Sequence, residues 1–126
     1  KIFLATLFVV TLGFTSQASN EEYINHRESI ETYYSGVSTI CKMVQQGNVD
    51  AVLNLINAGT NINQKSGGMT PLMYAARQNK VEIVKLLLAR GAKLKIRSDK
   101  GLTALDYAKQ SKAKESYTLI AQAMNA

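Results

Sequence analysis

Two residue types that enzymes often use in nucleophilic catalysis, histidine as a general base and cysteine as a nucleophile, are scarce in this chain. The sequence has one histidine, His26, and one cysteine, Cys41. A thiol beside an imidazole can become a nucleophile, because the imidazole takes up its proton. Here His26 has the polar neighbours of a solvated surface residue. Cys41 lies among apolar residues and is expected to be a buried, inert thiol.

We therefore predict that the chain is not an enzyme. The rival hypothesis is that His26 and Cys41 act together, and an unchanged activity in the Cys41→Ser variant would count against it.

The sequence also lacks the residue patterns of known metal and cofactor sites. Cysteine, histidine and carboxylate residues form no cluster with metal-ligand spacing. Gly67 and Gly68 are not followed by the Lys-Ser or Lys-Thr of a phosphate-binding loop. Asp106 is expected to provide a hydrogen bond or a negative charge at the start of a helix. We predict no cofactor and no metal.

The main feature of the sequence is a segment that is repeated three times. Residues 69–95 are the clearest copy, and weaker copies flank them. Val52 recurs as Val84 and Tyr74 recurs as Tyr107, at steps of 32 and 33 residues. Such a period indicates a stack of small units, none of which can bury its apolar face alone. A stack of this kind offers a surface for binding other molecules.

Turn and cap residues divide each unit into two helices. Gly47 can adopt the left-handed conformation that ends a helix, and Asn79 replaces glycine in the middle unit. Thr70 can cap a helix that has Pro71 at its first position. In the first unit the predicted helices span residues 39–46 and 49 to about 58. In the middle unit one helix is opened by Thr70-Pro71 and the second spans 81–89. In the last unit the first helix starts at Thr103, the turn lies near 111–112, and the second helix ends near 123.

Apolar residues of the second helices are expected to fill the layers between units. Val49 should face inward in the first unit and Leu87 in the middle unit. In the last unit the inward residues thin to Tyr117, Ile120 and Met124. This thinning suggests a closing unit that faces water on one side.

The first residues have the pattern of a signal peptide. Residues 2–14 carry no charge, and Ser16 and Ala18 are the small residues that signal peptidase accepts before its cut. The run is shorter than the roughly 20 residues of a membrane-spanning helix. We therefore predict a signal peptide at 1–18, export to the periplasm or outside the cell, and no stable membrane insertion after cleavage. Residues 19–35 are predicted to form an N-terminal capping helix.

Charge is distributed unevenly along the chain. Residues 19–40 carry one Arg against four Glu, a net charge of −3. Residues 41–126 carry thirteen Lys and Arg against five Asp and Glu, a net charge of +8. A basic surface attracts acidic partners, although surface lysines also serve ordinary solubility. Nucleic acid is not expected as a partner, because no recognition module is visible.

The middle copy resembles the ankyrin repeat. Residues 69–92, MTPLMYAARQNKVEIVKLLLARGA, follow the pattern T-P-L-H-x-A-A, a turn, and I-V-x-x-L-L-x-x-G-A. Met73 stands where histidine is usual, and we expect its thioether to fill the space without making the hydrogen bonds that the histidine would make between neighbouring units. The resemblance implies an all-α solenoid of helix-turn-helix units joined by β-hairpin-like loops. The implied repeat domain spans 36–126, with units at about 36–67, 68–100 and 101–126.

In ankyrin-repeat proteins, partners bind the concave side, which the hairpin tips and the first helix of each unit form. The resemblance thus implies a non-catalytic, monomeric module that binds another protein. Aromatic, Met and Arg residues are enriched in interface centres. The main contributions are expected from Tyr34, Met69, Arg77, Lys100 and Leu102. The whole predicted surface comprises Tyr34, Val37, Gln45, Gln46, Ser66, Met69, Arg77, Gln78, Asp99, Lys100, Leu102 and Gln110.

Several more specific functions stay open at this point. The chain would serve either as a periplasmic immunity protein that blocks a delivered toxin, or as an accessory of a stress enzyme such as a catalase. A structural alternative is a dimer formed through the poorly patterned first unit, which light scattering would detect.

Overall fold

The computed structural model of this chain describes residues 37–126, and every structural statement below concerns this part. The predicted signal peptide and capping helix, together with His26 and Tyr34, lie outside the described residues.

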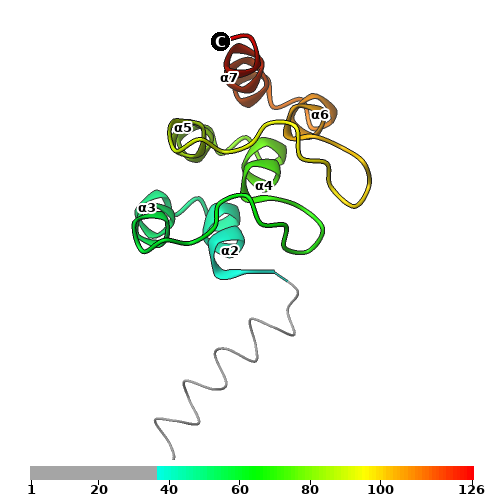
Figure 1. Cartoon of the computed structure of the whole chain (residues 1–126). Helices are drawn as coiled ribbons and strands as arrows, with labels where there is room; N and C mark the ends of the chain where they lie inside the picture. Colours follow the sequence, from blue (N-terminus) through cyan, green and yellow to red (C-terminus); the bar gives the residue numbers. More distant parts are fainter. Residues whose placement is uncertain (1–36) are drawn as a thin grey trace, which may run out of the picture. The chain divides into compact units, whose positions relative to one another are not determined.

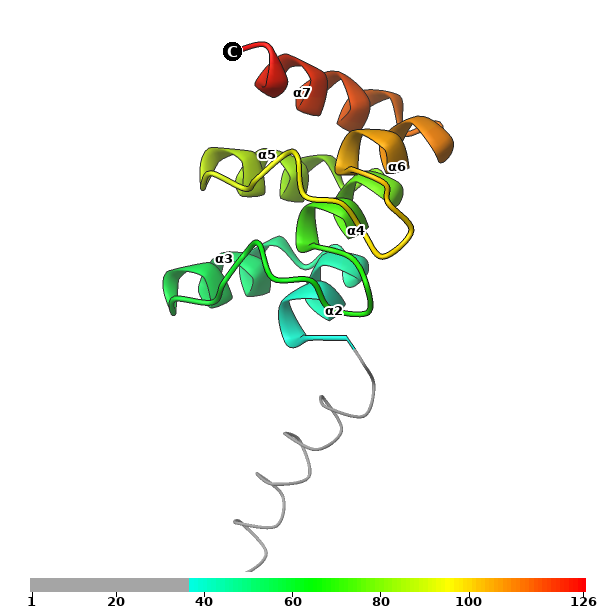
Figure 2. The same cartoon turned by 45° about the vertical axis from the view of Figure 1, so that its right-hand side comes forward.

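Six helices make up the described part of the chain, and they form three antiparallel pairs that stack one on another (Figure 1). The connecting loops, residues 58–70 and 90–103, project on the side of the first helix of each pair (Figure 2). This arrangement confirms the predicted all-α solenoid. The helices are α2 (Thr39–Gln46), α3 (Val49–Asn57), α4 (Pro71–Arg77), α5 (Val81–Ala89), α6 (Ala104–Gln110) and α7 (Lys114–Met124).

Threonine caps start the first helices of the second and third units, as predicted for Thr70. The Thr70 hydroxyl accepts a hydrogen bond from the Met73 N–H at 3.3 Å. The Met73 sulfur accepts one from the Thr70 N–H, also at 3.3 Å. This hydrogen bond lies within the second unit and does not join neighbouring units. In the next unit Asp106 accepts from the Thr103 N–H at 2.9 Å, which confirms the predicted role of this carboxylate.

The turn inside each pair uses a left-handed residue at the same position. Gly47 has φ 71°, Asn79 has φ 52° and Lys112 has φ 60°. The Asn79 side chain also joins two units, since its Oδ1 accepts from the Ser116 hydroxyl at 2.8 Å. Its Nδ2 donates to Glu115 Oε2 at 2.8 Å. A residue chosen for its backbone conformation thus also connects the second unit to the third.

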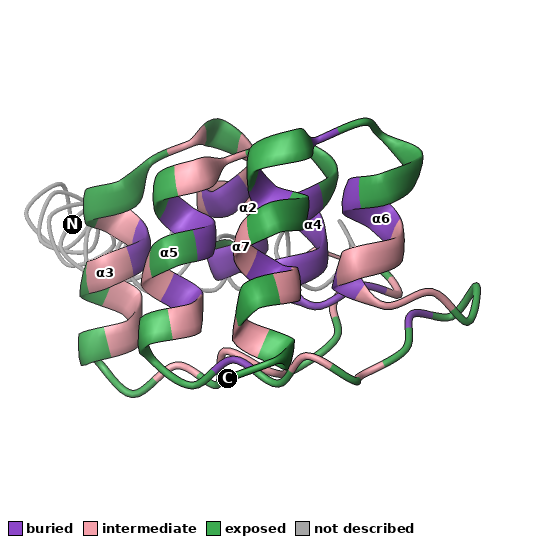
Figure 3. Cartoon of the chain, turned by 90° about the horizontal axis from the view of Figure 1, so that it is seen from above, coloured by how far each residue is buried: buried purple, intermediate pink, exposed green. Residues whose placement is uncertain are grey.

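The core lies between the helices of each pair and between successive pairs (Figure 3). Leu87 and Ile120 are 0% exposed, as predicted for these two positions. Packing joins α4 to α6 and α5 to α7, as it joins α2 to α4 and α3 to α5. No helix among residues 37–126 is long and apolar enough to cross a membrane.

Three residues predicted to face inward are exposed instead. Val49 is 37% exposed at the first position of α3, Tyr117 is 39% exposed and Met124 is 43% exposed. Tyr117 and Met124 belong to the last unit, where the described chain provides no further layer to cover them. Ser116 is fully buried beside them, because Asn79 satisfies its hydroxyl.

Candidate functional site

A hollow of about 240 Å³ lies where α4 meets the tips of the two connecting loops. We call it the hairpin hollow. It is lined by Gly67, Gly68 and Met69 from the first loop, Tyr74 and Arg77 from α4, Asp99 and Lys100 from the second loop, and Tyr107 from α6.

Two tyrosines at equivalent repeat positions hold the loops against the helices. The Tyr74 hydroxyl donates to the Ser66 carbonyl at 2.8 Å. The Tyr107 hydroxyl donates to the Ser98 hydroxyl at 2.9 Å. Each of these residues is 6% exposed, so the tyrosines line the hollow mainly as buried supports. They were absent from the predicted surface, although their 33-residue spacing marked them as a repeated feature.

The two loops also contact each other at the hollow. The Asp99 N–H donates to the Gly68 carbonyl at 3.0 Å, and the Asp99 carboxylate lies 3.1 Å from the Lys65 ammonium. Both charged side chains are well exposed, so this ion pair contributes at most about 1 kcal/mol to stability. Gly68 has φ 82°, and a Cβ atom there would lie 2.8 Å from the Asp99 carboxylate. Glycine therefore permits the close approach of the two loops.

Positive charge is in excess at the hairpin hollow. Arg77 and Lys100 are exposed, and neither side chain makes a hydrogen bond or an ion pair within residues 37–126. Asp99 is the carboxylate of the lining, and Lys65 already balances its charge. The guanidinium and the ammonium are thus available to a ligand that carries negative charge.

The Tyr74 hydroxyl keeps its proton at this site. Burial raises the pKa of the Tyr74 hydroxyl, and the nearby Cys41 and Tyr107 raise it further against the opposing effect of Arg77. The phenol therefore stays protonated near neutral pH and acts as a hydrogen-bond donor. No group of three or more metal-ligating side chains occurs in the described part of the chain.

Cys41 is placed as the sequence predicted. The residue is 0% exposed. Burial raises the pKa of its thiol above the ordinary value of 9.0, and a side-chain hydrogen bond with Ser38 opposes this rise only in part. The reactive thiolate is therefore disfavoured at neutral pH.

The structure brings four of the predicted surface residues together in the hairpin hollow: Met69, Arg77, Asp99 and Lys100. Met69 is only 7% exposed and belongs to the hydrophobic core, so little of its side chain is accessible at the hollow. Its contribution to partner binding stays a prediction.

The other predicted residues within 37–126 do not line this hollow. Val37, Gln45, Ser66 and Leu102 are half-buried, and the Ser66 carbonyl is held by Tyr74. Gln46, Gln78 and Gln110 are exposed at the ends of the first helices.

Comparison with known protein families places the chain among repeat proteins. Residues 40–125 match the family model described as ankyrin repeats in three copies. One relative is the 2-5A-dependent ribonuclease of Homo sapiens, 39% identical over 66 residues, which cover 51% of this chain and 9% of the ribonuclease. Another is a Rickettsia bellii protein named as an ankyrin repeat protein, 33% identical over 86 residues, which cover 63% of this chain and 49% of that protein.

A solved structure has the same architecture. The crystal structure of an ankyrin repeat domain from Acinetobacter baumannii AYE matches with a TM-score of 0.64 and 30% sequence identity. The match covers 71% of this chain and 48% of that one. The chain therefore spans about half or less of the length of each of these proteins.

Proposed function

The chain belongs to the ankyrin-repeat family, and we propose that it binds one specific protein partner through the hairpin hollow. Ankyrin repeats are in general non-catalytic modules for protein–protein interaction. The observation that supports the site is the presence of Arg77 and Lys100, two exposed cations whose side chains have no hydrogen-bond or ion-pair partner within residues 37–126, beside two buried tyrosines.

The proposed partner presents acidic side chains to this hollow. A guanidinium can hold a carboxylate through two parallel hydrogen bonds, which gives Arg77 both strength and geometric selectivity. Lys100 adds a second charge from the opposite loop. The net charge of +8 on residues 41–126 would speed the encounter with an acidic protein by long-range attraction.

The cellular setting is part of the proposal. Residues 1–18 have the features of a signal peptide, which supports export to the periplasm or outside the cell. An immunity protein would bind a toxin there, and an accessory protein would bind a stress enzyme such as a catalase. Ribonuclease activity is not proposed, since this chain covers 9% of the ribonuclease.

Capture of the partner tests the site. The full chain is immobilised, incubated with native extract of the producing cells, and the captured protein is identified by mass spectrometry and purified. Its affinity is then measured for Arg77→Ala/Lys100→Ala and for Lys93→Ala/Lys95→Ala, which removes the same charge from exposed positions outside the hollow.

We expect the first variant to lose at least about tenfold in affinity, because interface hot spots contribute more than about 1 kcal/mol each. The control variant should bind nearly as well as the original chain. Circular dichroism should be unchanged for both. Equal affinity of the two variants would show that the partner does not bind at the hairpin hollow. A partner whose binding surface has no acidic side chains would contradict the proposed role of charge.

A further inference from the structure

The charges of the hairpin hollow do not follow the repeat. Arg77, Asp99 and Lys100 line the hollow, and the residues related to them by a step of 32 or 33 carry no charge. These equivalents are Gln45 and Gln110 for Arg77, Ser66 for Asp99, and Gly67 for Lys100. The two tyrosines of the lining, Tyr74 and Tyr107, occupy one repeated position. The tyrosines thus belong to the repeat, whereas the charged group occurs at one place in the stack.

One member of this group, Asp99, has the same sign of charge as the proposed ligand. Its backbone N–H donates to the Gly68 carbonyl at 3.0 Å, which holds the residue where the two loops meet. Its Oδ1 accepts from Lys65 Nζ at 3.1 Å, whereas its Oδ2 has no hydrogen-bond partner within residues 37–126. Lys65 does not belong to the lining of the hollow. The hollow therefore meets the negative end of this ion pair.

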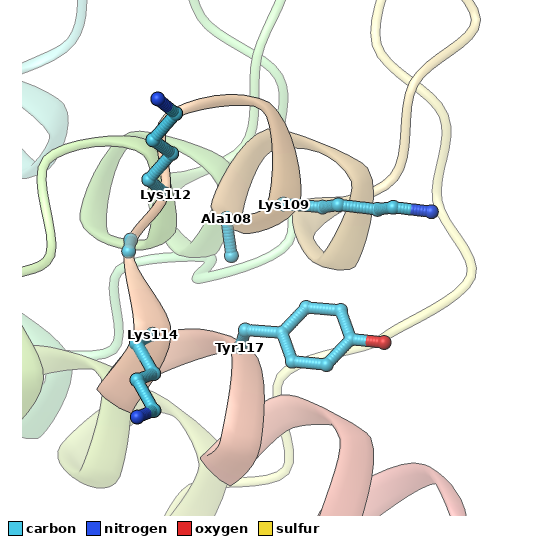
Figure 4. A pocket seen from close by; sticks show the side chains of 6 residues that line it. Ala108, Lys109, Lys112, Lys114 and Tyr117 are labelled. Carbon is cyan, nitrogen blue, oxygen red and sulfur yellow. The ribbon is translucent and has the colours of Figure 1, made fainter.

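A second hollow, of about 350 Å³, is basic and contains no such carboxylate (Figure 4). The residues of its lining, which come from α6, α7 and the turn between them, are Ala108, Lys109, Lys112, Ala113, Lys114 and Tyr117. The Lys109 side chain points away from those of Lys112 and Lys114, so the three do not converge on one point (Figure 4). We call it the reference hollow, because it attracts anions only through general positive charge.

A carboxylate beside two cations changes which anions bind well. An isolated carboxylate of a partner needs only Arg77 and Lys100 as its own partners. A polyanion carries a charge on every nucleotide or sugar along its length, so binding at the same two cations brings further negative charges beside Asp99. Like charges brought together at a binding surface weaken binding and suppress wrong partners. Asp99 therefore opposes polyanions more than it opposes one carboxylate.

We propose that Asp99 is a specificity-determining residue of the hairpin hollow. It restricts the hollow to an isolated carboxylate of the partner protein and keeps out polyanions, which the net charge of +8 on residues 41–126 attracts from a distance. This inference rests on the proposed function, since it concerns the ligand of the same two cations, Arg77 and Lys100. It narrows the partner to one that presents a single acidic side chain at the hollow rather than a run of them.

Removal of a whole ion pair tests the inference without changing the net charge. The hollow variant, Lys65→Gln/Asp99→Asn, loses the pair at the hairpin hollow. The matched control, Glu82→Gln/Lys85→Gln, loses the pair on α5, whose N–O distance is 3.0 Å and whose side chains are 69% and 54% exposed. Both pairs are exposed, so circular dichroism should be unchanged in both variants.

Two probes are titrated into the full chain and followed by amide NMR: a short oligothymidine, and a blocked peptide of Gly and Ser with one Glu. The amides of Gly68 and Lys100 report the hairpin hollow, and those of Ala113 and Tyr117 report the reference hollow. In the hollow variant, the oligothymidine affinity at Gly68 and Lys100 should rise about threefold or more. It should change less than about twofold at the reference hollow and throughout the control, as should the affinity of the single-Glu peptide.

The inference is overturned if the oligothymidine affinity does not rise at the hairpin hollow, if it rises equally in the two variants, or if the single-Glu peptide gains as much. The proposed function is tested separately by Arg77→Ala/Lys100→Ala and the captured partner. If that variant loses the partner while the hollow variant gains no oligothymidine affinity, only the role of Asp99 is refuted. If that variant keeps the partner, the proposed function fails, and the inference about its ligand fails with it.

Discussion

At the scale of single residues, one position shows how the repeats use different chemistry for the same task. Met73 and Asp106 are related by the 33-residue step, and each accepts a hydrogen bond from the N–H of the threonine that caps its helix. The thioether is a weak acceptor, whereas the carboxylate is charged and faces the positive end of a helix. Asp106 additionally accepts from the Thr103 hydroxyl at 2.9 Å.

Stability should therefore depend on the ionisation of Asp106. Hydrogen bonds from the Thr103 N–H and then from its hydroxyl lower the pKa of this carboxyl below the ordinary 3.8. Because the folded pKa lies below the unfolded one, the stabilisation is complete above pH 3.8 and is lost as the pH falls through the folded pKa.

We expect Asp106→Ala to cost about 1 kcal/mol of unfolding free energy at neutral pH, as for other helix caps. Urea denaturation at neutral and acid pH measures this difference. The two chains should converge in stability as the pH falls below 3.8, and a constant difference there would contradict the assignment.

At the scale of elements, the second helices provide the layer that joins the units. Leu87 is 0% exposed in α5, whereas Leu119 of α7 is half-buried and lines a surface hollow beside α5. Leu87→Ala should lower the unfolding free energy by about 2–5 kcal/mol, because it leaves a cavity between layers. Leu119→Ala, the same chemical change with fewer neighbours, should cost clearly less. Chemical denaturation measures both, and equal costs would show that the layers do not carry the stability.

The hairpin loops depend on glycine for two separable reasons. Gly68 and Gly101 occupy equivalent positions with φ 82° and 78°, which a side chain strains by about 1–2 kcal/mol. Only at Gly68 would the new Cβ also meet the Asp99 carboxylate, at 2.8 Å. Gly68→Ala should therefore destabilise the protein more than Gly101→Ala.

A double-mutant cycle isolates the contact from the strain. Adding Asp99→Ala to Gly68→Ala should recover the excess cost and leave only the backbone strain. The unfolding free energies of the four chains give the coupling. Additive effects would mean that Asp99 simply turns away into solvent.

At the scale of the whole molecule, the charge of the repeats opposes their stacking. Residues 41–126 have a net charge of +8, and the described residues contain two ion pairs, both exposed. Repulsion among the lysines should therefore outweigh these attractions at low ionic strength.

Moderate salt should stabilise the fold for this reason. We expect Tm to rise by roughly 2–5 °C between low salt and about 0.15 M sodium chloride, where the screening length is about 8 Å. Lys93→Gln/Lys95→Gln should show a smaller rise. Thermal melts followed by circular dichroism measure the effect, and a fall of Tm with salt would contradict the role of repulsion.

The sequence alone determined the helices, their caps and the period of the stack. Thr70, Gly47 and Asn79 act within a few residues of their own positions, so their roles follow from local geometry. The periodic apolar residues then required that the units stack, because no unit can bury its own face.

Only the tertiary structure decided which surfaces are hollow, charged or covered. The hairpin hollow unites Tyr74 and Arg77 with Lys100, and its loops meet through the bond from the Asp99 N–H to the Gly68 carbonyl. Exposure of Tyr117 likewise depends on whether another layer lies above it. Contacts between residues about thirty positions apart depend on how the units pack, and local sequence patterns do not contain that information.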